Sequence, residues 1–303
     1  MMITVYGDQA EELAEKAKKE VQRLDSLLST GNPESEVGKI NAGGGGVLSE
    51  DGQYLMKRSL ELWKETDGAF DLTVYPLMEL WGFTDSSFKV PSDDDLKKAL
   101  TLVGSDMVKF DEATGETAFA IEGMKIDFGG IAKGYASSQV VSLLREAGAE
   151  HAMVNLGGNV QALGGKPDGS DWRIGVRMPD GTNDIMCVLS IRDCAVITSG
   201  GYERFFEEGG KTYHHILDPK TGRPADNSLL SVTVVSEDGT SADALATALF
   251  IMGEEKAEEY WREHRTEFNL ILAMADGSVK VTEGIAERCK TELPLTVIRA
   301  DAK

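Results

Sequence analysis

The chain has 303 residues, 41% of them hydrophobic, which is enough to bury a full core and to form one large domain or two. Its 51 acidic residues against 31 basic ones give a formal net charge of −20, which argues against nucleic acid or an anionic membrane surface as the main partner. The sequence contains no apolar run long enough to span a membrane.

The N-terminal part of the sequence predicts mainly helices. A first strand at residues 3–6 precedes a long helix at residues 9–28, whose apolar side chains recur with a helical period. A glycine-rich loop at residues 43–46 and a second helix at residues 51–65 follow. Ser92, with acidic residues directly after it, is expected to open a third helix.

Farther along the chain the pattern changes to strands. A short apolar strand is expected to run through Asp127 into the pair Gly129–Gly130, and a helix carrying Lys133 follows. Further strands are expected at residues 152–156, 160–163, 172–177, 187–191, 195–198, 213–216 and 230–235. A run of strands bracketed by helices predicts an α+β fold dominated by antiparallel sheet. Because no Pro-, Ser- or charge-rich linker interrupts the chain, we expect residues 1–303 to form a single domain.

The connection from Asp127 to Lys133 has the features of an anion site. Paired glycines let a ligand approach the backbone closely, and the N-terminus of the following helix favours anions. A carboxylate and an amine flank the same turn. The pattern therefore indicates a phosphate or metal–phosphate site, and the alternative is an ordinary tight turn.

A second candidate lies on a later helix. Ser241 or Thr240 is the expected N-cap, and Asp243 and Thr247 are four residues apart, which places them on one helical face. A carboxylate and a hydroxyl supply hard oxygen ligands, which suit Mg²⁺ or Ca²⁺ rather than zinc. The alternative is an acid favoured by the helix dipole beside an ordinary helical threonine.

A third candidate is the segment from Tyr213 to Pro224. It has the pattern of a strand that ends in a turn shaped by proline and glycine. We expect Asp218 to form this turn and His215 to point away from the end of the strand.

A series of short motifs extends in order through nearly the whole chain. They are Ser29–Asn41, Gly68-Ala-Phe-Asp-Leu-Thr73 with Leu80-Trp-Gly-Phe83, Asp127-Phe-Gly-Gly-Ile-Ala-Lys-Gly-Tyr135, Val154-Asn-Leu-Gly-Gly-Asn159, Thr198-Ser-Gly-Gly-Tyr-Glu-Arg204, His215-Ile-Leu-Asp-Pro-Lys-Thr-Gly222 and Ala242-Asp-Ala-Leu-Ala-Thr247. With these motifs the sequence resembles the ApbE family of FAD:protein FMN transferases. Each motif alone is weakly specific, but the series in this order is highly specific.

The resemblance implies a T-fold-like α+β architecture, with a mainly antiparallel sheet, flanking helices and a nucleotide cleft between two sub-lobes. It also implies Mg²⁺-dependent transfer of FMN from FAD to a Thr or Ser hydroxyl of an acceptor protein through a phosphoester bond, with release of AMP. Acceptors in the family are flavin-carrying proteins of membrane or extracellular redox systems. Some members hydrolyse FAD to FMN and AMP, which breaks the same pyrophosphate bond.

The resemblance also assigns the metal site. Asp243 and Thr247 would contribute side-chain oxygens and Gly130 its backbone carbonyl, so that two remote segments meet on one Mg²⁺ ion. Lys133 would place a cation near the phosphates or the flavin.

Two residues are candidates for catalysis by the same resemblance. His215 is the first candidate for the general base or for a donor that orients the phosphate, and the alternative is a histidine bonded to turn carbonyls. Asp127 is expected to bind a hydroxyl of AMP, orient the acceptor or tune the metal. The alternative for Asp127 is an acid that caps the glycine turn.

Further residues are expected to hold the flavin nucleotide. Trp81 and Phe83 are candidates to stack on the isoalloxazine or adenine ring, because flat heterocycles gain from stacking as well as from apolar burial. The alternative for Trp81 is a place in the core. The resemblance adds Asn41, Gly82 and Ile216 to the cofactor-binding residues.

Two departures from the family pattern are visible. Many relatives carry an aromatic residue at the position of Gly31, where it packs on the nucleotide, so one stacking partner is absent here or is supplied from elsewhere. The chain begins inside the first strand, and no secretory signal precedes Tyr6. Family members usually work outside the cytoplasm, so we expect a periplasmic protein or membrane-associated lipoprotein whose leader is missing here, with a cytoplasmic protein as the alternative.

Two other functions fit the same sequence. An Mg²⁺-dependent FAD pyrophosphatase would use water in place of the acceptor hydroxyl. A non-catalytic FAD-binding protein would need the ring pocket but not the metal ligands Gly130, Asp243 and Thr247.

The three cysteines show no pattern of a disulfide framework, although Cys187 and Cys194 could pair across a hairpin in an exported protein. Cys187, Cys194 and Cys289 are odd in number and have no CxxC spacing, which argues against a disulfide framework or a zinc site. We expect each to be a small buried apolar residue.

Overall fold

The computed structural model describes residues 1–182 and 184–301, which divide into two compact units. The first unit comprises Met1–Gln22, Lys133–Tyr202 and Asn227–Lys303, and the second comprises Arg23–Ala132 and Glu203–Asp226. The boundaries fall within helix α1 (Ala10–Leu28) and at the start of helix α6 (Ala132–Glu146). The single domain with a cleft between two sub-lobes stays a prediction.

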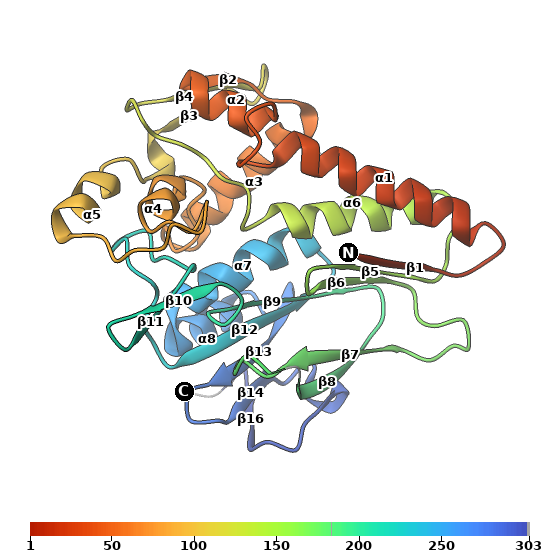
Figure 1. The fold of residues 1–303 in the computed structure, drawn as a ribbon. Coiled ribbons are helices and arrows are strands. Elements are labelled where there is room, and N and C mark those ends of the chain that lie inside the picture. The colour runs from red at the N-terminus through yellow and green to blue at the C-terminus, as the bar shows by residue number, and fades with distance from the viewer. Residues whose placement is uncertain (183, 302–303) are drawn as a thin grey trace. The chain divides into compact units, whose positions relative to one another are not determined.

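The first unit is built on an eight-stranded sheet (Figure 1). In spatial order its strands are β1 (Met2–Val5), β5 (Ala152–Leu156), β6 (Asn159–Leu163), β9 (Ala195–Gly200), β12 (Leu229–Ser236), β13 (Phe268–Met274), β14 (Val279–Thr282) and β16 (Leu295–Ile298). Neighbouring strands are antiparallel except β14 and β16, which are parallel. The predicted α+β fold with a mainly antiparallel sheet is therefore confirmed.

The large sheet of the first unit is covered on both faces. Helix α7 (Gly239–Met252) contacts β9 and β12, and helix α8 (Glu254–Glu263) contacts β13. A second, antiparallel sheet with the order β15 (Cys289–Lys290), β8 (Ile185–Ile191) and β7 (Trp172–Arg177) shares one apolar cluster with the large sheet. A short 3₁₀ helix, η2 (Ala286–Arg288), leads into β15. Because helices and the small sheet cover the large sheet, its central strands are buried on both sides.

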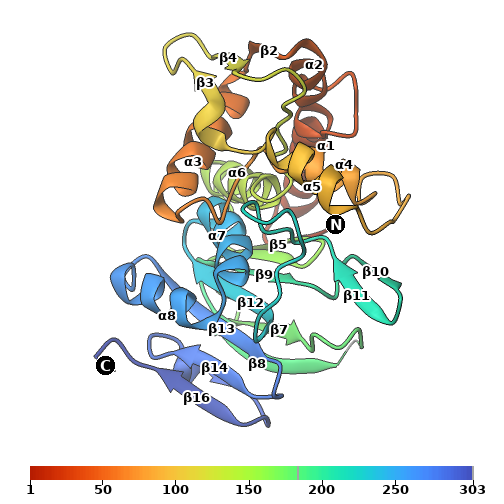
Figure 2. The same cartoon turned by 90° about the vertical axis from the view of Figure 1, so that its left-hand side faces the viewer.

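The second unit combines short helices with two small sheets (Figure 2). Its helices are α2 (Glu36–Gly43), α3 (Glu50–Glu65), α4 (Tyr75–Leu80), α5 (Asp93–Leu100) and the 3₁₀ turn η1 (Ser105–Met107). One antiparallel sheet has the order β2 (Gly45–Val47), β4 (Glu116–Phe119) and β3 (Val108–Phe110), and the other is the hairpin of β10 (Phe205–Glu208) and β11 (Lys211–His214). An apolar cluster around Leu77, Trp81 and Phe83 forms a core between α4, α5 and the segment that follows β11.

Local polar contacts fix the ends of these helices. Ser92 caps α5 as predicted, and its hydroxyl accepts a hydrogen bond from the Asp95 amide at 3.2 Å.

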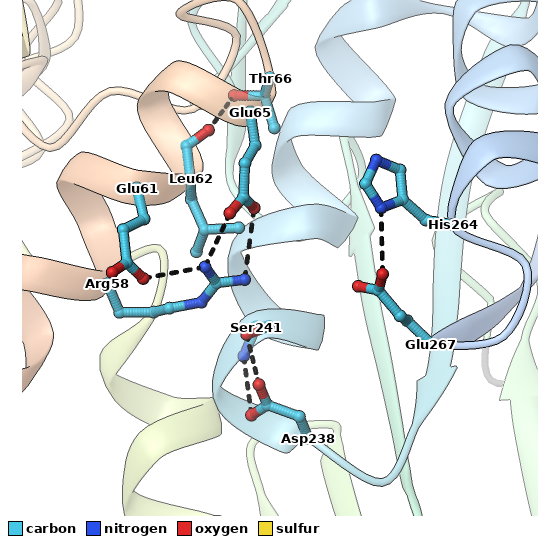
Figure 3. Close-up of polar contacts among 9 residues, drawn as sticks. All are labelled: Arg58, Glu61, Leu62, Glu65, Thr66, Asp238, Ser241, His264 and Glu267. Atoms are coloured by element: carbon cyan, nitrogen blue, oxygen red, sulfur yellow. Dashed lines mark hydrogen bonds and ion pairs between the residues drawn. The ribbon is translucent and has the colours of Figure 1, made fainter.

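Ion pairs also lie along the side of α3. Arg58 pairs with Glu61 and Glu65 one and two turns farther on, both at 3.1 Å (Figure 3). These exposed pairs add little to stability, because water screens them.

Two local predictions were wrong. The N-cap of α7 is Asp238 and not Ser241 or Thr240, because its carboxylate accepts bonds from both of their backbone amides, at 3.2 and 3.0 Å (Figure 3). The stretch before Gly129–Gly130 belongs to no strand, and the Asp127 amide donates to the Leu72 carbonyl at 2.7 Å. None of the described helices has the length and apolar character needed to cross a membrane.

Trp81 lies in the core of the second unit. Its side chain is 0% exposed, and its indole Nε1 donates a hydrogen bond to the Gly222 carbonyl at 2.7 Å. Its ring lies 5.5 Å from that of Tyr213. The structure therefore confirms the alternative interpretation of Trp81 as a core residue. Stacking of Trp81 on a flavin stays a prediction.

Replacing Trp81 with Phe should destabilise the protein by about 1–3 kcal/mol, because the buried Gly222 carbonyl loses its donor. Trp172→Phe is the matched control, since the buried Trp172 Nε1 has no hydrogen-bond partner among the described residues. Urea unfolding should therefore show a clearly smaller loss for Trp172→Phe. Equal losses in the two variants would contradict this assignment of the hydrogen bond.

Candidate active site

Asp243 is a buried carboxylate near the start of α7, with 3% of its surface exposed. One oxygen, Oδ2, accepts a hydrogen bond from the Gly134 amide, and the other, Oδ1, accepts one from Asn159 Nδ2, both at 2.8 Å. Burial raises the pKa of Asp243, while the charge of Lys133 and the two N–H donors act in the opposite direction. Burial thus disfavours the charged form of Asp243, and the Lys133 charge and the hydrogen bonds favour it.

Gly134 allows helix α6 to approach helix α7 closely enough for its amide to bond to Asp243. A Cβ atom on Gly134 would lie 2.1 Å from the Gly239 carbonyl oxygen and 2.7 Å from the Asp243 Cβ. No other residue fits there, because the backbone and the Cβ atom are not free to move aside. The glycine that follows Lys133 in the sequence motif is therefore needed for the contact between the start of α6 and the start of α7.

A tight hairpin places Asn159 beside Asp243. Gly157 and Gly158 have φ angles of 66° and 102°, which suit a two-residue hairpin turn and favour glycine. The turn joins β5 to β6, and the Gly158 amide bonds to Asn155 Oδ1 at 2.9 Å. Asn159 is the first residue of β6 and is 4% exposed. The role of Asn159 was not predicted, although Gly-Gly directly before the asparagine is a local signal for the turn.

Thr247 lies one turn after Asp243 on α7, as predicted. Its hydroxyl is 3.1 Å from that of Ser199 on β9. The Asp243 oxygens accept N–H bonds from Gly134 and Asn159, and a carboxylate has about four lone-pair sites, so capacity for a cation remains. Hard oxygens of this kind fit Mg²⁺. No group of three or more His, Cys, Asp or Glu side chains suited to a metal occurs among the described residues, so an ion here would need further oxygen ligands.

Asp127 in the second unit is held on one side only. Its Oδ1 accepts hydrogen bonds from the Thr30 hydroxyl at 2.5 Å and from the Gly129 amide at 3.0 Å. Within the described part of the chain, its Oδ2 makes no hydrogen bond. The expected cap on the glycine turn is therefore present, and one carboxylate oxygen remains available to a ligand. Thr30 was not anticipated, because it lies 97 residues from Asp127 in the sequence.

Asn41 fixes the backbone directly before Asp127. Its side-chain amide donates to the Ile126 carbonyl and accepts from the Ile126 amide, both at 2.8 Å. At Gly31, by contrast, a Cβ atom would meet no other atom within 4 Å, so the position has room for a side chain. Asn41 therefore positions the segment that carries Asp127, and its contact with a nucleotide stays a prediction.

His215 follows β11 directly and bonds to the backbone of Arg204. The Arg204 carbonyl accepts from the His215 amide at 3.0 Å and from its ring Nδ1 at 3.1 Å. A carbonyl can only accept, so Nδ1 carries the proton and Nε2 is the basic nitrogen of the neutral ring. The ring lies 6.3 Å from that of Phe83, which is 1% exposed. The alternative of a carbonyl-bonded histidine is observed, and the role of His215 as a base stays a prediction.

The other predicted site residues are distributed over both units. Lys133 is exposed in the first turn of α6, and Ile216 is buried after β11. Gly82 has a φ of 75°, and a Cβ there would lie 2.2 Å from the Ser87 carbonyl oxygen. Gly130 belongs to the second unit, whereas Asp243 and Thr247 belong to the first. Their meeting on one ion stays a prediction.

Comparisons with known proteins all indicate the same family. The family model described as ApbE family matches residues 1–272. The chain belongs to the ApbE family. The FAD:protein FMN transferase of Treponema pallidum is 35% identical over 287 residues, which cover 89% of this chain and 79% of that protein. The FAD:protein FMN transferase of Klebsiella pneumoniae is 38% identical over 250 residues, covering 81% and 77%.

Solved structures of the ApbE family have the same fold. The ApbE protein of Thermotoga maritima gives a TM-score of 0.85 at 35% identity, covering 93% of this chain and 92% of that one. The flavinyl transferase ApbE of Pseudomonas stutzeri, in its apo form, gives 0.81 at 31% identity, covering 92% and 88%. Asp127, His215, Asp243 and Thr247 all lie within the residues that the ApbE model matches.

Asn159→Ala should destabilise the protein by about 1.5–3 kcal/mol, because the buried Asp243 carboxylate loses one of its donors. Asn155→Ala removes a hydrogen bond from the same hairpin, but that bond is exposed to solvent, so a smaller loss is expected. Urea unfolding of both variants at neutral pH provides the comparison. The assignment fails if Asn155→Ala costs as much as Asn159→Ala.

Proposed function

We propose that this chain transfers FMN from FAD to a Thr or Ser hydroxyl of an acceptor protein, with Mg²⁺ as the required ion and AMP as the second product. Membership of the ApbE family and the relatives named FAD:protein FMN transferase support transfer of FMN to a protein. The observation in this chain that carries the metal requirement is the buried Asp243 carboxylate, which keeps acceptor capacity beside the Thr247 hydroxyl.

The proposed reaction is a displacement at the phosphorus atom on the FMN side of the pyrophosphate. The acceptor oxygen forms a bond to this phosphorus, the bond to the AMP oxygen breaks, and AMP leaves with that oxygen. Catalysis of such a step rests chiefly on positioning and on stabilising charge. Mg²⁺ supplies charge stabilisation at the phosphates when bound. Asp243 and Thr247 would hold it by their side-chain oxygens and Gly130 by its backbone carbonyl.

The remaining candidate residues orient the reactants and move the proton. His215 takes the proton of the acceptor hydroxyl on Nε2, the nitrogen left basic by the bond between Nδ1 and Arg204. Asp127 presents Oδ2 to a substrate hydroxyl, while Thr30 and Gly129 hold Oδ1. Lys133 is exposed and adds a cation for the anionic pyrophosphate in a chain whose net charge is −20.

The acceptor in this proposal is a flavin-carrying protein of a membrane or extracellular redox system. The proposed location is accordingly outside the cytoplasm. Family resemblance supports both statements, and an acceptor domain of that class is the reagent for the assay below.

The deciding experiment incubates the protein with FAD and Mg²⁺, with and without an acceptor domain, and follows AMP release together with covalent flavin on the acceptor. The proposal requires AMP and labelled acceptor in equal amounts. AMP with free FMN alone would identify an FAD pyrophosphatase. Absence of AMP under both conditions would leave a protein that binds FAD without chemistry. Chelation with EDTA should stop transfer, and added Mg²⁺ should restore it.

Asp243→Ala should lower AMP release by more than about tenfold, because loss of groups around a metal typically costs at least this factor. Asp238→Ala is the matched control, since it removes a carboxylate that caps the same helix. That control should lose about 1 kcal/mol of stability and retain most of its turnover. Equal activity of the Asp243 variant and the wild type would rule out Asp243 as a metal ligand.

Thr30→Val should slow transfer by about ten- to a hundredfold, because Asp127 loses a hydrogen bond to its charged group. Thr30→Ser keeps the hydroxyl and should stay close to the wild-type rate. Transfer rates at saturating FAD, with circular dichroism to verify folding, compare the two variants. A Val variant as active as the Ser variant would show that Thr30 does not position Asp127.

A further inference from the structure

Two of the three cysteines meet in the small sheet of the first unit. Cys289 on β15 is paired in register with Leu189 on β8, and Cys187 lies two residues before Leu189. Because side chains on a strand alternate between faces, Cys187 and Leu189 share a face, and Cys289 lies diagonally across from Cys187 on it. Both cysteines belong to the apolar cluster between the two sheets and are 2% and 6% exposed.

The two thiols are close enough to change each other's pKa through a side-chain hydrogen bond. This bond lowers the pKa of Cys289, because the Cys187 thiol stabilises the neighbouring thiolate. The same bond, together with burial, raises the pKa of Cys187. Cys194 differs, since burial raises its pKa to about 11. A thiolate is the nucleophile in disulfide exchange, and Cys289 lies on the short edge strand β15, so a reagent reaches its sulfur first when β15 separates from β8.

We propose that Cys187 and Cys289 form a disulfide when the protein meets a small-molecule disulfide such as oxidised glutathione. The Cys289 thiolate attacks one glutathione sulfur, the glutathione disulfide bond breaks, and one glutathione leaves. Cys187, having lost its proton, then attacks the Cys289 sulfur and releases the second glutathione. The cysteines lose two electrons and two protons, which reappear in two glutathione thiols.

The position of Cys289 gives this bond a structural role. It lies outside residues 1–272, which the ApbE model matches. Strand β15 has only two residues in register with β8, and the chain continues from it to β16 at the edge of the large sheet. A bond between Cys187 and Cys289 would close a long loop and hold the C-terminal strands in place, chiefly by restricting the unfolded chain.

Burial determines how the proposal is tested. A reagent of the size of glutathione reaches the sulfurs only when β15 separates from β8, so oxidation is best carried out during refolding from urea. The full chain is refolded with excess oxidised glutathione, and free thiols are counted after denaturation. One free thiol per chain, with peptide mapping that links Cys187 to Cys289, is the expected result. Protein refolded with dithiothreitol should show three.

Variants separate this pair from chance oxidation. Cys194→Ser should form the same link and leave no free thiol, whereas Cys187→Ser and Cys289→Ser should not form it. The oxidised wild type should unfold several degrees above the reduced form, and dithiothreitol should abolish the difference. The proposal is overturned by three free thiols after oxidation, by a link that includes Cys194, or by glutathione that stays bound to Cys289 without transfer to Cys187.

Discussion

The geometry of the first unit's candidate site depends on a carboxylate buried without a bonded cationic side chain. Removing a charge from water is costly unless hydrogen bonds replace the lost hydration, and both oxygens of Asp243 accept N–H bonds. The first donor requires Gly134, because only glycine lets α6 approach Gly239 on α7. The second requires the Gly157–Gly158 turn, which places Asn159 at the start of β6. The hydrogen bonding of Asp243 thus explains features of three sequence motifs, namely those that contain Gly134, Asn159 and Asp243 itself.

The second unit applies the same principle to a partly exposed acid. Thr30 and Gly129 bond to one oxygen of Asp127, and Asn41 holds the adjacent Ile126 backbone by both its amide and its carbonyl. These contacts fix the direction of the carboxylate and leave its other oxygen available to a ligand. A residue prepared in this way loses little entropy when substrate binds, which is what positioning in catalysis requires.

The sequence predicted the fold class and the helix of Asp243 because both depend on local patterns of apolar and capping residues. The hydrogen-bond partners of Asp243 and Asp127 were not predicted, because they are distant in the sequence. Asn159 lies 84 residues from Asp243, and Thr30 lies 97 residues from Asp127, so no local spacing links them. Strand β2 was interpreted as a loop because its glycines carry no strand propensity, although their backbone groups pair with β4. The cap of α7 was misplaced because Ser241, a good cap by type, itself bonds to Asp238.

The raised pKa of Asp243 connects the proposed chemistry with stability. An acid whose pKa is higher in the folded state binds its proton more tightly there than in the unfolded chain. Its contribution to stability therefore decreases as the pH rises from the ordinary aspartate range through the raised pKa, and the ionised form is a cost to the folded protein. A cation bound at Asp243 would offset this cost, since it favours the ionised form. Ligand binding to the folded state alone also stabilises it by mass action. The buried charge of Asp243 would thus favour metal binding, and the stability of the fold would depend on the bound metal.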